Sequence, residues 1–393
     1  MKIYNASVGG AFRLFISDNQ TDVLVVDFDT SLTDMEKCFI NDFAYKIGFR
    51  NNLKKEKNDD ESDYYEWYNI TDKFLDYVKQ QKNPIKDING NELDLKDLKE
   101  IKVAADTIKD KINFYEMIDK INSDYLLPER YFGKISNINC EYPFVIKSAY
   151  GKGGKGNIVC FSENDLAEVK RIFSSDLFKT KQENINNDYA NKVIIEKFFS
   201  NVPSYNLSFY CNKDGSMQRE NISQQIIDEV FYRGNLYPVP ISSICRQKIM
   251  NIGKYICTYI GKNYNYVGWI GLDFILVNDC IYVIEANARV NSVTHAHQLA
   301  KGNSFVIKLL KHQNKDVKSV LGSFFFDNKL KCGILPYQIP NNEEILIISV
   351  NSSLSQAQKQ LEEFKKQNKL TDVLQEITDG HSKSISYYVA RIK

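Results

Sequence analysis

The sequence lacks the features that mark membrane, secreted or nucleic-acid-binding proteins. No stretch approaches the roughly 18 uninterrupted apolar residues of a membrane helix, and the first residues show no basic segment followed by a long apolar one. The 51 Lys and Arg residues balance 50 Asp and Glu residues, so a net charge of +1 creates no overall field for nucleic acid or an anionic membrane. We therefore expect a cytoplasmic protein that binds neither.

Cysteine and histidine are also uninformative as metal or disulfide signals. The eight cysteines include no C-x-x-C pair, and some, such as Cys160 in "NIVCF" and Cys211 in "LSFYC", lie inside strand-like runs. We interpret them as reduced, small core side chains. Among only four histidines, His295 and His297 form an H-x-H pair, but no further His or Cys follows at a spacing that suits zinc.

The length and composition of the sequence indicate a globular protein of two or three domains. With 393 residues, of which 43% are hydrophobic and 26% charged, the chain can bury sizeable cores. Residues 1–107 contain the strand-like "DVLVVDFD" and predict an N-terminal α/β domain. An amphipathic helix is expected from Asp106, with Lys111 close to its start.

Strand-like runs dominate between residues 142 and 279. Helical stretches at 163–173 and 240–261 join them, which predicts a mixed α/β and α+β layout for residues 108–314. After residue 315 two strand-like runs, a helix and the segment "SISYYVARI" predict a small C-terminal α/β unit over 315–393.

A glycine-rich loop follows one of these strands. In "FVIKSAYGKGGKGNIVCF", Lys147 ends an apolar run, and four glycines with two more lysines lead into another strand. Glycines let backbone N–H groups converge on phosphate oxygens. The pattern is neither a P-loop nor a dinucleotide fingerprint, because a strand rather than a helix follows. It predicts a hairpin that folds over a nucleotide; a plain surface hairpin is the alternative.

Oxygen-bearing side chains gather in "GLDFILVNDCIYVIEANAR". Glu285 and Asn287 are two apart on an apolar strand, so they leave the same face. Asp273 on the preceding strand completes a set suited to Mg²⁺. The alternative is that Glu285 and Asn287 only form the solvent face of the strand.

Asp273 and Glu285 can bind one metal only if the two strands that carry them pair in a particular register. A two-residue turn at Asn278 and Asp279 in a regular ladder would place Asp273 opposite Ile284, on the wrong face. We therefore predict either a three-residue connection or a one-residue bulge within a strand, with Asn278 or Asp279 at positive φ. If neither occurs, only Glu285 and Asn287 hold the metal.

Taken in order, Asp110-Lys111, "VIK" with its glycine loop, "VIIEKFF", "GLDF" and "IEANAR" resemble the motifs of the ATP-grasp superfamily. The resemblance covers residues 108–298 and implies two α+β subdomains that grip ATP, with a lid at about 120–198. The wider sequence is similar to amino-acid and peptide ligases of the pheganomycin type. No acidic residue follows "EKFF" at the place where the family usually binds ribose.

The resemblance also implies a role for each matched position. Lys111 and Lys147 contact phosphates, Glu285 and Asn287 with Asp273 hold magnesium, and Arg289 faces the reacting acyl group. The remaining positions form the lid loop, namely Gly151, Lys152, Gly153, Gly154, Lys155 and Gly156, and the adenine hinge, namely Glu196, Lys197, Phe198 and Phe199. In the hinge, Lys197 C=O accepts from the adenine amino group and Phe199 N–H donates to the ring.

We expect, therefore, an ATP- and Mg²⁺-dependent carboxylate-amine ligase that acts on amino acids or a short peptide through an acyl phosphate. His295 and His297 then line the substrate pocket or act on the amine. The alternatives are a small-metabolite kinase of the same fold, a ligase to a carrier thiol, and an ATP-binding regulatory module without turnover. Its partners are ATP and small carboxylate and amine substrates, and a homodimer remains open.

Overall fold

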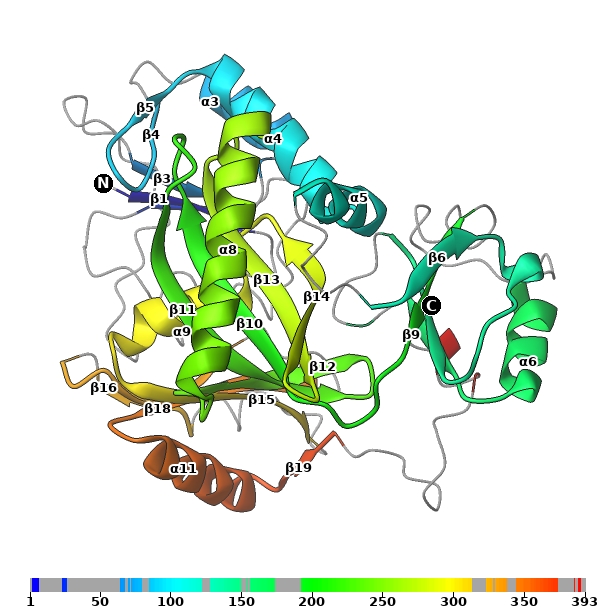
Figure 1. Ribbon diagram of the computed structural model, residues 1–393. Coiled ribbons are helices and arrows are strands. Elements are labelled where there is room, and N and C mark those ends of the chain that lie inside the picture. Colours follow the sequence, from blue (N-terminus) through cyan, green and yellow to red (C-terminus); the bar gives the residue numbers. More distant parts are fainter. Residues whose placement is uncertain are drawn as a thin grey trace.

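In the computed structural model, the described part of the chain forms three β-sheets with helices packed on them (Figure 1). This mixed architecture agrees with the predicted fold class. The structure describes residues 2–6, 23–26, 64–67, 70, 72–79, 85–121, 128–149, 154, 156–173, 192–312, 323–327, 329–337, 344–373, 385 and 388–389.

The first sheet belongs to the N-terminal part of the chain and is largely parallel. Its order is β2-β1-β3-β4-β5, and only the last pair is antiparallel. The strands are β1 (Lys2–Ala6), β2 (Val23–Val26), β3 (Tyr64–Trp67), β4 (Ile85–Lys86) and β5 (Glu92–Leu93). Helix α3 (Asp72–Lys79) lies between β3 and β4 in the chain, and helix α4 (Leu95–Lys109) follows β5. The expected α/β character of this region is confirmed.

Helix α5 (Lys111–Ile121) begins later than predicted. Residues 106–109 belong to the preceding helix α4, and helical structure is interrupted at Asp110, whose backbone is extended. Asp110 Oδ1 accepts from Ile112 N–H (2.9 Å) and Asn113 N–H (3.0 Å), satisfying two of the donors that a helix start leaves open. Lys111 therefore lies at the very start of α5.

The second sheet is small, antiparallel and ordered β6-β9-β7-β8. Its strands are β6 (Arg130–Gly133), β7 (Phe144–Lys147), β8 (Asn157–Cys160) and β9 (Val193–Lys197), with the short helix η3 (Ile135–Asn137) and helix α6 (Glu163–Phe173). In Figure 1 this unit stands apart from the large sheet, with α6 on its outer side. Ile385, Tyr388 and Val389 near the C-terminus pack into its core.

The third sheet is the largest, with ten strands in the order β14-β13-β10-β11-β12-β15-β18-β17-β16 and β19 paired to β15. The strands before the longest helix are β10 (Ser204–Cys211), β11 (Met217–Asp228) and β12 (Phe231–Tyr237). Those after it are β13 (Gly268–Val277), β14 (Cys280–Asn287), β15 (Ser304–His312), β16 (Phe325–Asp327), β17 (Cys332–Pro336), β18 (Glu344–Asn351) and β19 (Leu370–Asp372).

Three helices accompany this sheet: α8 (Ser243–Tyr264), α9 (Ser292–Ala300) and α11 (Leu354–Gln367). Helix α8 packs on β10 and β11, and α11 packs on β15 and β18 (Figure 1). The C-terminal strands thus continue the large sheet through β15. The predicted domain limits at 107/108 and 314/315 remain predictions.

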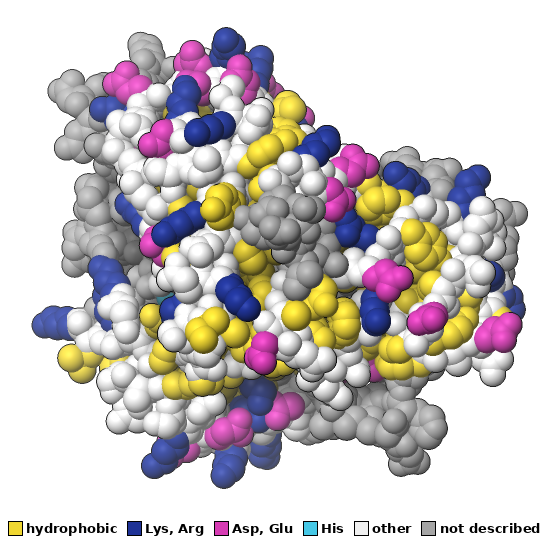
Figure 2. All heavy atoms as spheres, viewed as in Figure 1, with side chains coloured by type: hydrophobic (Ala, Val, Ile, Leu, Met, Phe, Trp, Pro, Cys, Tyr) yellow, Lys and Arg dark blue, Asp and Glu magenta, His cyan; other side chains and the backbone are white. Residues whose placement is uncertain are grey.

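The distribution of surface charge and the state of the cysteines agree with the expectations from the sequence. On the face shown in Figure 2, basic and acidic side chains are interspersed among apolar ones. The seven cysteines within the described ranges form no disulfide. Among those same residues, no helix combines the length and the apolar character needed to cross a bilayer.

Candidate active site

Asp273 and Glu285 lie directly opposite each other on β13 and β14. The strands are joined by a two-residue turn at Asn278 and Asp279, whose φ angles are 48° and 65°. A one-residue bulge at Ile284 shifts the ladder and brings Glu285, in place of Ile284, opposite Asp273. The bulge that we predicted as one of two solutions is confirmed, and both turn residues adopt positive φ.

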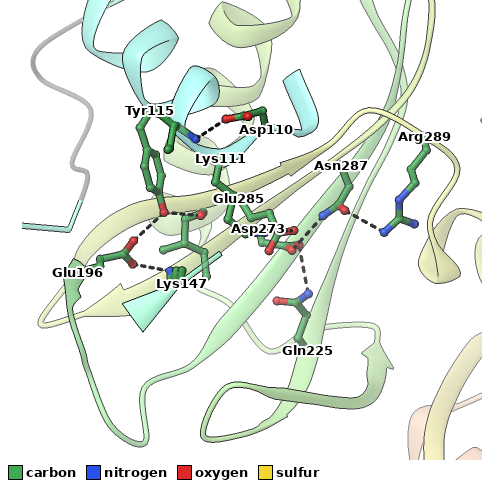
Figure 3. Close-up of polar contacts among 12 residues, drawn as sticks. Asp110, Lys111, Tyr115, Lys147, Glu196, Gln225, Asp273, Glu285, Asn287 and Arg289 are labelled. Carbon is green, nitrogen blue, oxygen red and sulfur yellow. Dashed lines mark hydrogen bonds and ion pairs between the residues drawn. The ribbon is translucent and has the colours of Figure 1, made fainter. Parts of the chain in front are cut away.

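Amide side chains surround the Asp273 carboxylate (Figure 3). Asn206, its cross-strand partner on β10, donates to Asp273 Oδ1 at 2.6 Å, and Gln225 on β11 donates to the same oxygen at 3.1 Å. Burial and the neighbouring Glu285 carboxylate raise the pKa of Asp273 to about 7. Two facing carboxylates at this depth therefore favour a cation between them.

Asn287 and Arg289 extend this network. Strand β14 ends at Asn287, yet Arg289 N–H donates to the Asn287 carbonyl at 2.8 Å and keeps the guanidinium beside it. Arg289 donates to Asn287 Oδ1 at 2.9 Å, and Asn287 Nδ2 lies 3.4 Å from Asp273 Oδ2. Because Oδ1 faces the guanidinium, Asn287 can bind a metal through that atom only if its amide turns.

Lys111 brings a positive charge to the carboxylate pair. Its side chain is 4% exposed, and Nζ lies 3.5 Å from Glu285 Oε1. The position follows from the break at Asp110, which starts α5 with Lys111 facing β14 (Figure 3). Lys111 therefore partly balances the negative charge of Glu285.

Lys147 ends β7 and forms a buried ion pair with Glu196 on β9. Nζ lies 2.7 Å from Glu196 Oε1, and the two side chains are 9% and 3% exposed. The other carboxylate oxygen, Oε2, lies 2.7 Å from the Tyr115 hydroxyl. Tyr115 and Glu196 thus connect the start of α5 to the small sheet.

The glycine loop is described in part. Gly154 and Gly156 form turns in which Ser148 N–H donates to Gly156 O (2.9 Å) and Asn157 N–H donates to Gly154 O (3.1 Å). Gly154 also touches the backbone of Val230 in the turn between β11 and β12. Four predicted members of the loop lie outside the described residues: Gly151, Lys152, Gly153 and Lys155.

The proposed adenine hinge runs along the end of β9. Lys197 N–H donates to Glu129 O at 2.8 Å, and Phe198 N–H donates to Pro143 O at 3.1 Å. These bonds use neither Lys197 C=O nor Phe199 N–H, the two groups expected to meet adenine. The hinge roles thus remain predictions with which the observed bonds are compatible.

His297 lies in an apolar environment. Its ring packs edge-on against Tyr237 and Phe305, with centroid distances of 4.4 and 4.9 Å. Nε2 is buried without a hydrogen-bond partner, and burial lowers the pKa of His297 to about 3. This placement suits packing in the neutral form rather than proton transfer to or from an amine.

The donor set fits a hard divalent cation. Within the described ranges no group of three or more His, Cys, Asp or Glu side chains is placed to hold a metal, so a zinc-type site has no support there. Asp273 and Glu285 supply two carboxylates on one face, and oxygen ligands of this kind suit Mg²⁺, which keeps part of its coordination for phosphates and water.

The chain resembles known proteins through this same region. Residues 128–287 match the family model described as "L-aspartate--L-methionine ligase, ATP grasp". The carbamoyl phosphate synthase large chain of Xanthomonas axonopodis pv. citri is 22% identical over 206 residues, which are 48% of this chain and 17% of that protein. Biotin carboxylase of Pseudomonas aeruginosa is 28% identical over 174 residues, 43% of this chain and 36% of that one.

Solved structures show that the likeness extends to the fold of nearly the whole chain. Carboxyaminoimidazole ribonucleotide synthase from Aspergillus clavatus, complexed with ATP, aligns with a TM-score of 0.56 at 13% identity over 93% of this chain and 97% of that one. Biotin carboxylase from Campylobacter jejuni aligns with a TM-score of 0.54 at 10% identity over 94% and 86%. The chain spans only about a sixth to a third of the curated relatives named above.

Proposed function

We infer that this chain, a member of the ATP-grasp superfamily, is an ADP-forming ligase that joins a small carboxylate to an amine. The observation that carries the proposal is the facing pair Asp273 and Glu285, with Lys111 at 3.5 Å from Glu285 and Arg289 beside Asn287. The match to an L-aspartate–L-methionine ligase model supports amino acids or a short peptide as substrates.

Each charged group has a task in nucleotide binding. Lys147 and Lys111, both almost fully buried, meet the phosphates of ATP, and the glycine loop covers them with backbone N–H groups. Adenine lies along the hinge of Glu196 to Phe199. Binding of phosphates would draw Lys147 from Glu196, and the Tyr115 hydroxyl then remains as a partner for that carboxylate.

Asp273 and Glu285, with Asn287 after rotation of its amide, would hold Mg²⁺. When bound, Mg²⁺ would supply positive charge against the phosphate oxygens. Burial and, after it, the facing Glu285 carboxylate raise the pKa of Asp273, and a cation bound between the two carboxylates would favour their charged forms.

The reaction needs positioning and charge compensation more than covalent help from the protein. A substrate carboxylate oxygen attacks the γ-phosphorus, the bond to ADP breaks, and an acyl phosphate forms. The amine nitrogen then attacks the acyl carbon, phosphate leaves and the nitrogen releases its proton. Arg289 donates to the oxyanion that develops on the acyl carbon.

A substrate screen tests this function. The protein is incubated with ATP, Mg²⁺ and pooled amino acids, while orthophosphate is measured and new condensation products are sought by mass spectrometry. Glu285→Gln, which keeps the shape of the side chain but removes its charge, is the negative control. We expect orthophosphate release and a condensation product when the amino acids are added, and neither from ATP and Mg²⁺ alone.

Two outcomes would count against the proposal. A phosphorylated metabolite without orthophosphate release would identify a kinase of this fold. ATP binding without any turnover, over a broad set of carboxylates and amines, would identify a binding module.

A further inference from the structure

Tyr115 connects three elements that each carry a proposed nucleotide or metal residue. It lies one turn after Lys111 on α5, and its side chain is 0% exposed. Its hydroxyl lies 2.7 Å from Glu196 Oε2 on β9 and 2.7 Å from the Ile284 carbonyl on β14 (Figure 3). A buried hydroxyl is costly unless it is hydrogen-bonded, and here two acceptors share its one hydrogen.

The contact with Ile284 falls on the residue that forms the bulge. A bulge leaves its extra residue outside the regular ladder, so its backbone needs other partners to hold one conformation. Tyr115 donates to that carbonyl, and the next side chain along the strand is Glu285. The hydroxyl therefore fixes the step in the strand that turns Glu285 toward Asp273.

The second contact of the Tyr115 hydroxyl, with Glu196, reaches the small sheet. Tyr115 meets Oε2 while Lys147 meets Oε1, so the carboxylate is held between them. Arg130 lies over the Tyr115 ring at 5.0 Å and forms an ion pair with Asp119 of α5 at 2.6 Å. The ring therefore has little freedom to move, and its hydroxyl stays at the junction of both sheets.

We propose that Tyr115 is a positioning residue that holds the Ile284 bulge, and with it the Asp273–Glu285 pair, in the geometry that binds metal-nucleotide. The proposal rests on the function inferred above, because it assigns Tyr115 to the same site. Tyr115 itself touches neither substrate nor metal in this scheme; it acts through Ile284 and Glu196.

The test compares Tyr115→Phe with Tyr266→Phe in the full chain. Tyr266 is a matched control, since it is also buried and its hydroxyl donates to a backbone carbonyl, that of Trp269, at 2.7 Å. The Kd of ADP is measured by calorimetry with Mg²⁺ and with EDTA, and the ratio of the two values reports the contribution of the metal site. Thermal unfolding is recorded for each protein.

We expect Tyr115→Phe to reduce the gain in ADP affinity from Mg²⁺ by at least fivefold, and Tyr266→Phe to leave it within twofold of the parent. A merely structural hydroxyl would lower the melting temperature without changing that ratio. An unchanged ratio in Tyr115→Phe, or an equal loss in Tyr266→Phe, would overturn the proposal. A parent protein that binds no ADP would instead refute the function on which it rests.

Discussion

Asp273 faces Glu285 across β13 and β14 because Ile284 is an extra residue in the ladder. The same strands close with a tight turn at Asn278 and Asp279, and turn and pairing are compatible only through that bulge. The bulge thus serves the site: it converts a regular hairpin, which would separate the carboxylates, into one that presents both to a cation.

The buried ion pair of Lys147 and Glu196 yields a stability prediction as well as an activity prediction. Lys147→Ala removes a phosphate contact and leaves the Glu196 carboxylate, 3% exposed, without its cation. We expect loss of ATP turnover and a fall of about 3 kcal/mol in the free energy of unfolding. ADP release and urea denaturation measure the two effects.

A double variant separates them. Lys147→Met with Glu196→Gln removes both charges at similar volume, so stability should recover most of the loss while turnover stays absent. Recovery of turnover together with stability would show that Lys147 acts only as a structural partner of Glu196.

The close approach of Gly154 to Val230 leads to a prediction about the position of the glycine loop. Its φ is +83°, and a Cβ there would lie 1.9 Å from the Val230 carbonyl oxygen. Gly154→Ala should therefore force the loop away from the β11–β12 turn and raise the KM for ATP at least tenfold. Initial rates at varied ATP measure the effect.

Gly302 provides the control for backbone conformation alone. Its φ is +94°, but nothing lies within 4 Å of a Cβ at that position. Gly302→Ala should cost on the order of 1 kcal/mol in stability and leave the KM for ATP within twofold. Equal KM values for the two alanine variants would show that the contact of Gly154 with the β11–β12 turn does not position the loop for ATP.

His297 predicts a loss of stability in acid. Burial lowers its folded-state pKa to about 3, below the ordinary value of 6.5, so below pH 6.5 the unfolded chain binds a proton that the folded chain does not. The free energy of unfolding should then fall as the pH drops from 6.5 towards 3, by up to about 1.4 kcal/mol per pH unit from this group.

The measurement is urea unfolding between pH 4 and 8 for the parent and His297→Gln. The difference between the two proteins should shrink or change sign as the pH falls, because the variant has no proton to bind. A pH-independent difference would show that His297 titrates normally in the folded protein.

Much of the site was predictable because its signals are local. The strand period placed Glu285 and Asn287 on one face, and the turn chemistry of Asn278 and Asp279 forced the choice between a longer connection and a bulge. The amphipathic pattern from Asp106 likewise predicted a helix with Lys111 close to its start. These inferences need only residues within one hairpin or one helix.

The remaining parts depend on distant residues. Gln225 meets Asp273 across 48 positions and lies on β11, whose polar sequence "MQRENISQQIID" gives no clear strand pattern; we did not predict β11 or β12. Tyr115 finds its hydroxyl partners 81 and 169 positions away. Sequence patterns predict that a side chain is buried but not which distant group satisfies its polar atom.

Substitution of Arg289 should distinguish an effect on the chemical step from an effect on ATP binding. It lies beyond the end of β14 and contacts the Asn287 amide at 2.9 Å, next to the proposed metal ligands. If it stabilises the oxyanion formed when the amine attacks, its contribution exists only in the transition state. Arg289→Ala should lower kcat by about 100- to 1,000-fold and leave the KM for ATP within about threefold.

Arg289→Lys should recover little of this rate, because an ammonium cannot reproduce the fork of a guanidinium against both Asn287 and an oxyanion. Arg171→Ala is the matched control: that arginine lies on α6 with a side chain 74% exposed, 3.9 Å from Glu168, so its loss changes the charge but not the site. Product formation under saturating ATP, measured for all three variants, decides the role. If Arg289→Ala instead raised the KM for ATP in proportion to its loss of kcat/KM, with kcat unchanged, Arg289 would belong to nucleotide binding and the oxyanion would need another donor.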